Sequence, residues 1–405
     1  APRPARRGMR VLVIGAGPAG MRCAERAAAA GAEVILCGEE RALPYDRVAL
    51  GRLLSGEAEA GALITHDAAR LRALGIRFRP GLRIASLDPG ARHALTAHGE
   101  AIGFDRAVLA LGAEPLRLPL PGAELPGVFA YRSLADVLGM RRWLARGMPV
   151  VVIGGGLLGL EAAAALAEAG ARVRVVHAAA WLMERQLDAE AGALLARQLA
   201  AARGLGFAMP ARTEAIEGRG RVEALRLADG TRLPAAMVVM AVGVRPRVAL
   251  AREAGLAVGR GILVDAAMRT SAPDVLAIGD CAEHEGMVSG LVAPALAMAE
   301  VAAATLRGEA ARYRPRPEPA TLKVAGLAVW SAGEIAPPDA EAITLTDAAA
   351  GRHRRLWLRE GRLVGAVLCG DTADAPFFLD LIASGRAVAP LRATLAFGPA
   401  FQEAT

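Results

Sequence analysis

Two stretches of the chain repeat the same order of residues, and this repeat constrains the fold more than any other feature. The first, VLVIGAGPAG, occupies residues 11–20, and the second, VVIGGGLLGLE, occupies residues 151–161. In each, a β-type run leads into a glycine turn, and an alanine-rich helical segment follows. A glycine then ends the helix before a second β-type run, at residues 34–37 and 173–176. Strand, glycine turn, helix and strand form a βαβ unit, which requires parallel strands.

The glycines of both turns follow the spacing G-x-G-x-x-G. The first permits a tight turn, the second lets the backbone approach a pyrophosphate, and the third lets helix and strand pack closely. The phosphates are then held at the positive end of the helix. Because each copy lies between a predicted strand and a predicted helix, we favour dinucleotide binding over a turn without a ligand. The candidate residues are Gly15, Gly17, Ala19 and Gly20 in the first turn and Gly154, Gly156, Leu158 and Gly159 in the second.

Two dinucleotide sites predict a pair of cofactors, FAD and a nicotinamide dinucleotide, between which a hydride can pass. The carboxylate that binds the adenosine ribose is expected about 20 residues after the glycines. In the first repeat we assign this role to Glu39. In the second repeat His177 occupies the strand end. A neutral imidazole can bind a 2′-hydroxyl and a charged one can tolerate a 2′-phosphate, whereas the alternative is that His177 only ends the strand.

Similar segments on either side of the second repeat indicate the domain organisation. FDRAVLALGAEP (104–115) contains Gly112, and AAMVVMAVGVRPR (235–247) contains Gly243; we expect both glycines to contact cofactors. We predict an α/β protein with two Rossmann-like domains, the NAD domain inserted in the FAD domain, and a small C-terminal α+β domain. The predicted limits are 1–117 and 244–312 for FAD binding, 118–243 for NAD(P)H binding, and 313–405 for the third domain, which begins with a proline-rich linker and includes a helix near 374–384.

Composition excludes several classes of protein. The net charge is +7, but the arginines are scattered and Lys323 is the only lysine, so we expect no nucleic-acid binding. No apolar run is long enough to cross a membrane, and the N-terminal segment lacks a signal-peptide core. The four cysteines are far apart, which predicts neither a redox pair nor a cysteine-ligated cluster. The six histidines show no metal-ligand spacing, so we expect no metal, and reduced thiols suit a cytoplasmic location.

Several motifs outside the glycine turns point to one family. They are PYDRVALGRLLSGE (44–57), VFAYRSLADV (128–137), WLMERQLD (181–188), AIGDCAEHEGMVSGLVAPALAMAEVAA (277–303) and GAVLCGDT (365–372). With the second glycine turn they resemble the FAD/NAD(H)-binding part of the assimilatory nitrate and nitrite reductase electron-transfer flavoproteins, close to rubredoxin and ferredoxin reductases. The likeness covers nearly the whole chain.

The resemblance implies roles for further residues. It places Arg47 and Arg52 along FAD, although the family usually has lysine at the second position. It places Asp280 on the ribityl chain, for which a simple helix cap is the alternative, and the helix that contains Pro294 against the flavin. It places Glu161 beside the nicotinamide. Because hydride transfer needs no acid, base or nucleophile, Glu161 is expected to position the ring. Relatives with VVH and LMERQLD use NADH, which favours NADH over NADPH.

The expected function is an NAD(P)H-dependent FAD flavoprotein that passes electrons to a protein partner in nitrate or nitrite assimilation. We expect the chain to be a separate donor subunit or one part of a larger system. A rubredoxin or ferredoxin reductase is the alternative. An NADH oxidase is less favoured because residues 41–57 contain no cysteine, and a flavin-bound sensor without turnover is disfavoured by the intact second glycine turn. Arg352, Arg354 and Arg355 are a candidate docking surface if exposed, or an ordinary solvated face.

Overall fold

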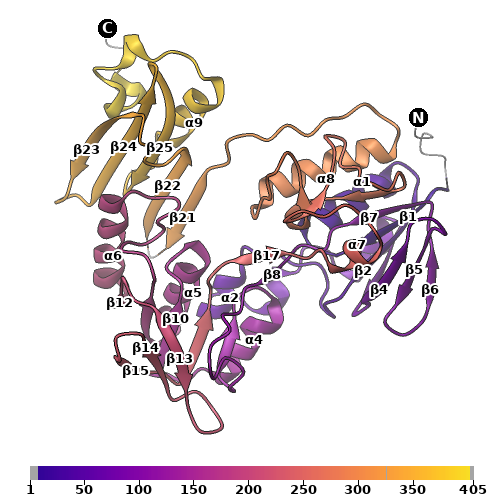
Figure 1. Cartoon of the computed structure of the whole chain (residues 1–405), viewed down its shortest axis with the longest axis horizontal. Helices are drawn as coiled ribbons and strands as arrows, with labels where there is room; N and C mark the ends of the chain where they lie inside the picture. The colour runs from indigo at the N-terminus through magenta and orange to yellow at the C-terminus, as the bar shows by residue number, and fades with distance from the viewer. Residues whose placement is uncertain (1–7, 325, 402–405) are drawn as a thin grey trace. The chain divides into compact units, whose positions relative to one another are not determined.

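The computed structural model describes residues 8–324 and 326–401, and the chain divides into two compact units (Figure 1). The first unit contains the residues up to Ala49, Glu59–Glu114 and Val244–Pro315. The second unit contains Leu50–Ala58, Pro115–Gly243 and the residues from Arg316 onward. Each unit therefore contains one of the two glycine turns, and the second unit also contains the C-terminal segment and a short piece of chain before Glu59.

The first unit is built on a parallel five-stranded sheet with β1 at its centre. In spatial order the strands are β19 (Val275–Ala277), β7 (Arg106–Leu109), β1 (Arg10–Ile14), β2 (Glu33–Gly38) and β3 (Ile76–Pro80). Ile14 pairs with Cys37 on one side and Leu109 on the other. The carboxyl ends of three strands therefore meet where the first glycine turn begins.

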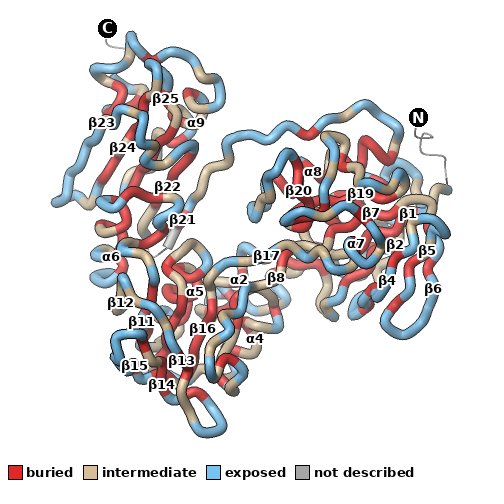
Figure 2. Tube along the Cα trace, in the orientation of Figure 1, coloured by how far each residue is buried: buried red, intermediate tan, exposed pale blue. Residues whose placement is uncertain are grey.

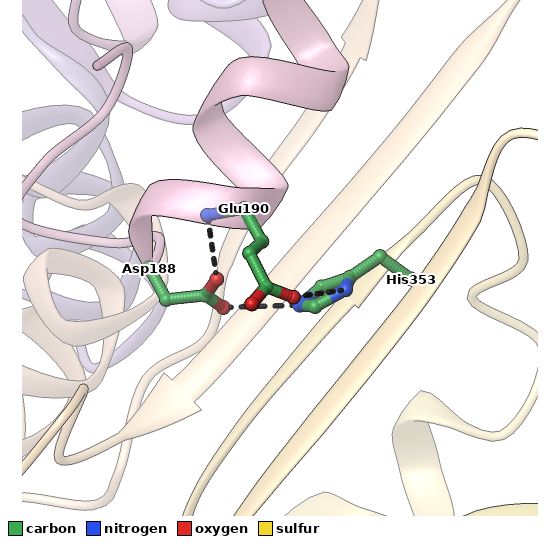
Figure 3. A group of neighbouring side chains, drawn as sticks. All are labelled: Asp188, Glu190 and His353. Atoms are coloured by element: carbon green, nitrogen blue, oxygen red, sulfur yellow. Dashed lines mark hydrogen bonds and ion pairs between the residues drawn. The ribbon is translucent and has the colours of Figure 1, made fainter. Parts of the chain in front are cut away.

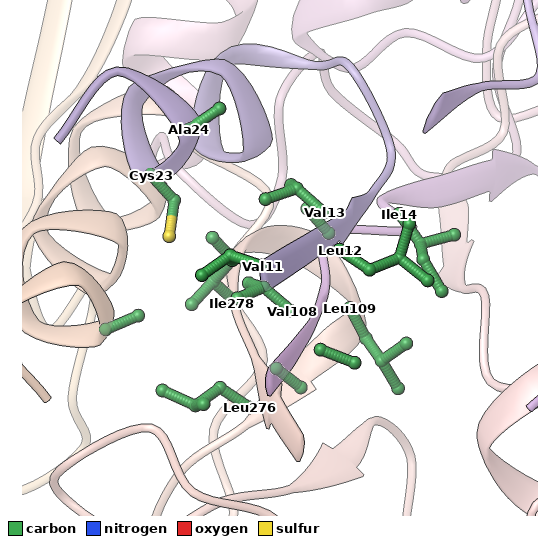
Figure 4. Packing of buried hydrophobic residues seen from close by; sticks show 14 of the residues in the cluster. Val11, Leu12, Val13, Ile14, Cys23, Ala24, Val108, Leu109, Leu276 and Ile278 are labelled. Carbon is green, nitrogen blue, oxygen red and sulfur yellow. The ribbon is translucent and has the colours of Figure 1, made fainter. Parts of the chain in front are cut away.

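Helices α1 (Pro18–Ala29) and α8 (Val292–Leu306) pack together in this unit (Figure 1). Figure 4 shows the apolar core beneath α1, in which Val11 of β1, Val108 of β7 and Ile278, directly after β19, lie near Cys23. At the helix surface Glu300 of α8 accepts hydrogen bonds from Arg22 and Arg26 of α1. These contacts fix α1, whose N-terminus follows the glycine turn.

The remaining elements of the first unit are short and lie around this sheet. A three-stranded antiparallel sheet contains β4 (Ile84–Asp88), β5 (His93–Thr96) and β6 (Ala101–Gly103). Strand β8 (Ala113–Pro115) pairs with β17 (Val244–Pro246), and β18 (Ile262–Leu263) pairs with β20 (Ala282–Glu283). The short helices are η1 (Ala60–Leu63), α3 (Ala68–Ala73), α7 (Ala249–Glu253) and η2 (Gly279–Cys281).

The second unit repeats this architecture, as the internal duplication predicts. Its parallel sheet has the order β12 (Gly206–Ala208), β11 (Arg172–Val176), β10 (Pro149–Ile153), β16 (Met237–Met240) and β9 (Val128–Ala130). Its antiparallel sheet contains β13 (Thr213–Glu217), β14 (Ala224–Leu227) and β15 (Arg232–Pro234). The outer strand beside β16 precedes the glycine turn in sequence, whereas its counterpart β19 follows the whole inserted segment. The two parallel sheets therefore have strands in equivalent positions, but the strands do not follow one another along the chain in the same order.

Helices α4 (Leu134–Trp143), α5 (Leu157–Glu168) and α6 (Ala189–Arg203) belong to the second unit, and α2 (Leu50–Ser55) packs against α4 and α5. Residues from Arg316 onward add an antiparallel sheet in the order β21 (Ala320–Val324), β22 (Leu327–Gly333), β25 (Arg362–Cys369), β24 (Arg352–Arg359) and β23 (Glu341–Asp347). Helix α9 (Ala375–Ser384) buries Phe378 against this sheet, and η3 (Ala389–Leu391), η4 (Leu395–Phe397) and η5 (Pro399–Phe401) follow.

The central strands of both parallel sheets are buried (Figure 2). Parallel sheets combined with helices confirm the predicted α/β fold class. The helix predicted near 374–384 is α9. The predicted exposure of the three C-terminal arginines is wrong for Arg354, which is 9% exposed. Its guanidinium donates to Asp374 and to the backbone carbonyl of Ala396, so it stabilises the C-terminal sheet from inside. The burial of Arg354 could not be read from the strand sequence, because an arginine is expected to be exposed unless a partner pairs with it in the folded chain.

The close approach of α5 to its glycine turn predicts different tolerances at two neighbouring glycines. A Cβ at Gly159 would lie 2.0 Å from the carbonyl oxygen of Gly154, whereas one at Gly156 would contact nothing within 4 Å. Gly159→Ala should therefore destabilise the second unit by about 1–3 kcal/mol, and Gly156→Ala should leave the free energy of unfolding nearly unchanged. Thermal and urea unfolding of both variants measures this difference. Equal stability of the two variants would contradict the packing.

Candidate dinucleotide-binding sites

The first glycine turn combines two closely packed glycines with one open glycine. Gly15 has φ +116°, and a Cβ there would lie 2.0 Å from the carbonyl oxygen of Ala110. A Cβ at Gly20 would lie 1.9 Å from the carbonyl oxygen of Gly15. At Gly17 nothing lies within 4 Å of the same position. Packing therefore requires the outer glycines, whereas the space beside Gly17 is free for a ligand to approach the backbone.

The second glycine turn has the same three environments. Gly154 has φ +115° and would place a Cβ 2.3 Å from the carbonyl oxygen of Ala241, and Gly156 is open. Neither α1 nor α5 has a side-chain cap at its N-terminus. The backbone N–H groups of both first turns therefore remain suitable for phosphate oxygens. Of the intervening predicted residues, Ala19 is buried against the core, and Leu158 is 36% exposed.

The ribose candidate of the first turn lies in a network of charges. Glu39 follows β2, is half exposed, and accepts a hydrogen bond of 2.7 Å from Arg247. The next residue, Glu40, accepts a 2.8 Å bond from the hydroxyl of Tyr45 and forms an ion pair with Arg47. The first unit therefore has two adjacent carboxylates after β2, and each is oriented by an arginine. Sequence reasoning did not identify Arg247, which comes from the segment after the insertion.

Arg47 and Asp280 come from distant parts of the sequence but interact in the first unit. Burial lowers the pKa of Arg47, while Tyr45, Glu40 and Asp280 raise it, and the net direction is upward. Asp280 is half-buried in η2, directly after β19. Pro294 is buried in the first turn of α8, whose N-terminus also has no side-chain cap. These predicted flavin-binding residues thus belong to one unit, as does Gly112, which has φ +68° and open space around it.

Arg52 and Glu161 belong to the second unit, in which α2 packs against α5. Arg52 forms a 2.8 Å ion pair with Glu57 and is largely exposed. Burial raises the pKa of Glu161 to about 7. Burial and the charge of Glu161 both raise the pKa of Tyr131, whose hydroxyl lies against Gly51 of α2. Gly243, with φ +112°, accepts a backbone hydrogen bond from Leu116. Tyr131 is a neighbour of Glu161 to which the sequence analysis assigned no role.

His177 lies at the end of β11, where it was predicted, but both ring nitrogens have protein partners. Nδ1 accepts a hydrogen bond of 3.1 Å from the backbone N–H of Gly155. Nε2 lies 2.9 Å from Oε2 of Glu184. A Cβ at Gly155 would lie 2.8 Å from Cγ of His177, so the imidazole requires glycine at this position of the turn. Glu184 lies within the WLMERQLD motif, and the sequence alone indicates no role for it.

One group of potential metal ligands occurs among the described residues (Figure 3): Asp188, Glu190 and His353. Asp188 caps α6 and its Oδ2 lies 3.2 Å from Nε2 of His353. Glu190 instead approaches Nδ1 at 3.8 Å, and this nitrogen also contacts Thr346. One ligand atom from each of the three residues lies within 4.8 Å of the others, but each carboxylate already lies beside a different ring nitrogen of His353.

A cation already lies beside these carboxylates. Arg355 is 3.8 Å from both Asp188 and Glu190. Burial raises the pKa of Asp188, but His353, the N–H of Ala191 and Arg355 lower it, and the net direction is downward. The group is therefore a partly buried ion-pair network between α6 and the C-terminal sheet, and Arg355 faces this network.

All four cysteines are free and buried. Burial raises the pKa of the Cys23 thiol to about 12 and that of the Cys281 thiol to about 11. Burial likewise raises the pKa of Cys37 and Cys369 to about 11. Thiols with such pKa values are protonated at neutral pH and are poor nucleophiles. Over the part of the chain that the structure describes, no helix has the length and apolarity needed to cross a membrane.

Comparison with known proteins finds similarity to flavoprotein reductases along most of the chain. Residues 9–305 match the pyridine nucleotide-disulphide oxidoreductase family, and residues 319–386 match the rubredoxin NAD+ reductase C-terminal domain. The assimilatory nitrate reductase electron transfer subunit of Bacillus subtilis (strain 168) is 34% identical over 382 residues, which are 93% of this chain and 49% of that protein. The NAD(P)H nitrite reductase of the same strain is 37% identical over 377 residues, 92% of this chain and 47% of that protein.

The fold is shared with solved reductases. The crystal structure of a ferredoxin reductase from Rhodopseudomonas palustris superposes with a TM-score of 0.88 at 30% identity, over 98% of this chain and 100% of that one. The chain spans about half the length of the two curated relatives. These matches confirm the resemblance predicted from the sequence. The chain belongs to the pyridine nucleotide-disulphide oxidoreductase family, which implies the use of a flavin and a pyridine nucleotide.

Proposed function

We propose that the first unit binds FAD, that the second unit binds NADH, and that the chain passes electrons from NADH to a redox partner protein. The observation that carries this proposal is the open space beside the two central glycines, Gly17 and Gly156. At the glycines on either side of each, the backbone packs too closely to admit a Cβ. A chain that needed only tight turns would not keep the central position free twice. The proposed FAD-binding limits are 1–117 and 244–312, with NAD(P)H binding in 118–243 and a docking domain in 313–405.

In the first unit, the proposed roles follow from charge and position. The N–H groups at the start of α1 would bind the FAD pyrophosphate. Glu39 or Glu40 would accept from the adenosine ribose, and Asp280, with Arg47 nearby, would hold the ribityl chain. The start of α8, which includes Pro294, would direct its positive end toward the flavin. When bound, FAD supplies hydride acceptance and release of electrons singly or in pairs.

In the second unit, the N–H groups at the start of α5 would bind the NADH pyrophosphate, and Glu161 would lie beside the nicotinamide. Glu161 carries no net charge below pH 7 and is ionised above it, because burial raises its pKa to about 7. An ionised carboxylate stabilises the positive charge that develops on the nicotinamide during hydride loss. Glu161 is therefore an electrostatic and positioning group and need not transfer a proton.

The proposed partner is a nitrate or nitrite reductase component, because the two curated relatives reported above carry those names. The alternative partner is rubredoxin, which the match of residues 319–386 favours, or a ferredoxin, which the similarity to the ferredoxin reductase structure favours. An oxidase reaction that needs a reactive cysteine has less support, since the thiols are buried and have raised pKa values. We propose a cytoplasmic location, in line with four unpaired cysteines.

The direct test is anaerobic mixing of the FAD-loaded full chain with NADH and, separately, NADPH. We expect NADH to bleach the flavin absorbance near 450 nm, and subsequent addition of a nitrate or nitrite reductase acceptor subunit to restore it faster than rubredoxin or ferredoxin does. Faster restoration by rubredoxin or ferredoxin would establish the alternative partner. A flavin that stays oxidised in excess NADH would contradict the proposed function.

Gly17→Ala provides the matched test of the flavin site. The added methyl meets no protein atom, so the fold should be retained, but it occupies the space through which the pyrophosphate approaches the backbone. We expect at least a tenfold weaker affinity for FAD, which about 1.4 kcal/mol of lost interaction produces. Flavin fluorescence during titration of the apoprotein measures the affinity, and circular dichroism checks the fold. Undiminished affinity would place the pyrophosphate elsewhere.

The raised pKa of Glu161 predicts a pH profile. Since ionisation of Glu161 above pH 7 stabilises the developing cation, the rate of flavin reduction by NADH should rise as the pH increases through about 7. Glu161→Gln should give a flat profile and a rate about tenfold lower at pH 8. Anaerobic stopped-flow measurements from pH 5.5 to 8.5 test this. An identical rise in the Glu161→Gln variant would assign the titration to another group.

A further inference from the structure

Glu184 contacts His177 at the end of β11 and presents a partly exposed carboxylate. His177 occupies the position at which such folds carry the ribose carboxylate, but its side chain is only 10% exposed. Its Nε2 lies 2.9 Å from Oε2 of Glu184, whose side chain is 36% exposed. Of these two side chains, the Glu184 carboxylate is therefore the more accessible to a ligand.

The hydrogen bonds assign the ring proton of His177. Nδ1 accepts from the N–H of Gly155, so it carries no proton in this arrangement. The proton is therefore on Nε2, which donates to Glu184. A neutral imidazole whose only N–H points at a carboxylate holds that carboxylate in place and adds no positive charge.

A second contact brings Glu184 to the glycine turn. The N–H of Met183 donates to the carbonyl oxygen of Gly155 at 3.0 Å. Met183 is buried and has φ +54°, a conformation that is unusual for a residue other than glycine. The turn is thus bound by His177 on its N–H and by Met183 on its carbonyl, and Glu184 comes directly after the second contact. Glu184 consequently lies beside the phosphate-binding turn, where the adenosine ribose of a dinucleotide belongs.

The first repeat shows the complementary arrangement. There the residue after the first glycine is Ala16 and the strand ends at Gly38, and a Cβ on Gly38 would lie 3.2 Å from Cβ of Ala16. In the second repeat the small residue is Gly155 and the large one is His177. Gly155, the middle one of three consecutive glycines, therefore makes room for the imidazole, and the glycine turn fits the His177 side chain.

We propose that Glu184, oriented by His177, is the carboxylate that binds the 2′-hydroxyl of the adenosine ribose and selects NADH over NADPH. A carboxylate accepts a hydrogen bond from the hydroxyl but repels a 2′-phosphate. Glu184 is the specificity-determining residue and His177 is a positioning residue. The inference rests on the proposed binding of NADH to the second unit.

The test uses the FAD-loaded full chain and measures dissociation constants for NADH and NADPH under anaerobic conditions. Glu184→Gln preserves the shape of the side chain but removes its charge. We expect NADH affinity to fall about tenfold, the effect of a hydrogen bond to a charged group, and NADPH affinity to stay or rise. Glu124→Gln, at a side chain that is 88% exposed in the same unit, is the matched control and should change neither constant.

His177→Asn tests the positioning role, because its amide oxygen can still accept from Gly155 while the bond to Glu184 is lost. We expect weaker NADH binding in this variant and no additional loss when it is combined with Glu184→Gln. Full additivity of the two changes would show that His177 does not act through Glu184.

A measurement on the unaltered chain keeps the inference falsifiable if a variant fails to fold. An NADH analogue whose adenosine ribose lacks the 2′-hydroxyl should bind the wild-type chain about tenfold more weakly than NADH. Equal affinity for the analogue, or an unchanged NADH to NADPH ratio in folded Glu184→Gln, would overturn the role of Glu184 while leaving NADH binding intact. Failure of the wild-type chain to bind NADH at all would instead overturn the proposed function, and this inference with it.

Discussion

The structure of each unit depends on one close approach, that of a helix to the glycine turn before it. Gly20 and Gly159 bring α1 and α5 within van der Waals contact of the carbonyl oxygens of Gly15 and Gly154, and any Cβ would prevent this. The approach aligns the helix N-terminus with the carboxyl ends of the parallel strands. It thereby produces a concentration of N–H groups beside an open central glycine, Gly17 or Gly156. The proposed phosphate binding thus follows from backbone packing, and the side chains around each turn would add selectivity.

The sequence predicts this arrangement well because it is local. Glycine spacing, the flanking β-type runs and the helix-ending glycines determine the turns, and β2 and β11 begin and end within one residue of their predicted runs. The fold class followed for the same reason. The sequence did not predict that α2 packs with α5 in the second unit, or that Arg354 is buried, because both depend on contacts between residues distant in the chain.

The site shows the same division. The backbone of both glycine turns was predictable, but the partners of the side chains around them were not. His177 was identified by its position, yet its orientation depends on Gly155 and Glu184, which flank it in space and not in sequence. Similarly, Glu161 was identified by resemblance, whereas its raised pKa results from burial in the folded second unit. Asp188, Glu190 and His353 come together only because β24 packs near the start of α6, and Arg355 makes this group an ion-pair network.

Binding stoichiometry measures whether one chain binds two different dinucleotides at its two glycine turns. Native mass spectrometry of the full chain, first with FAD and then with added NAD+, resolves each bound mass. We expect one FAD per chain, followed by one NAD+ that binds without displacing the flavin. A chain that binds a single dinucleotide, so that NAD+ and FAD exclude each other, would contradict the account.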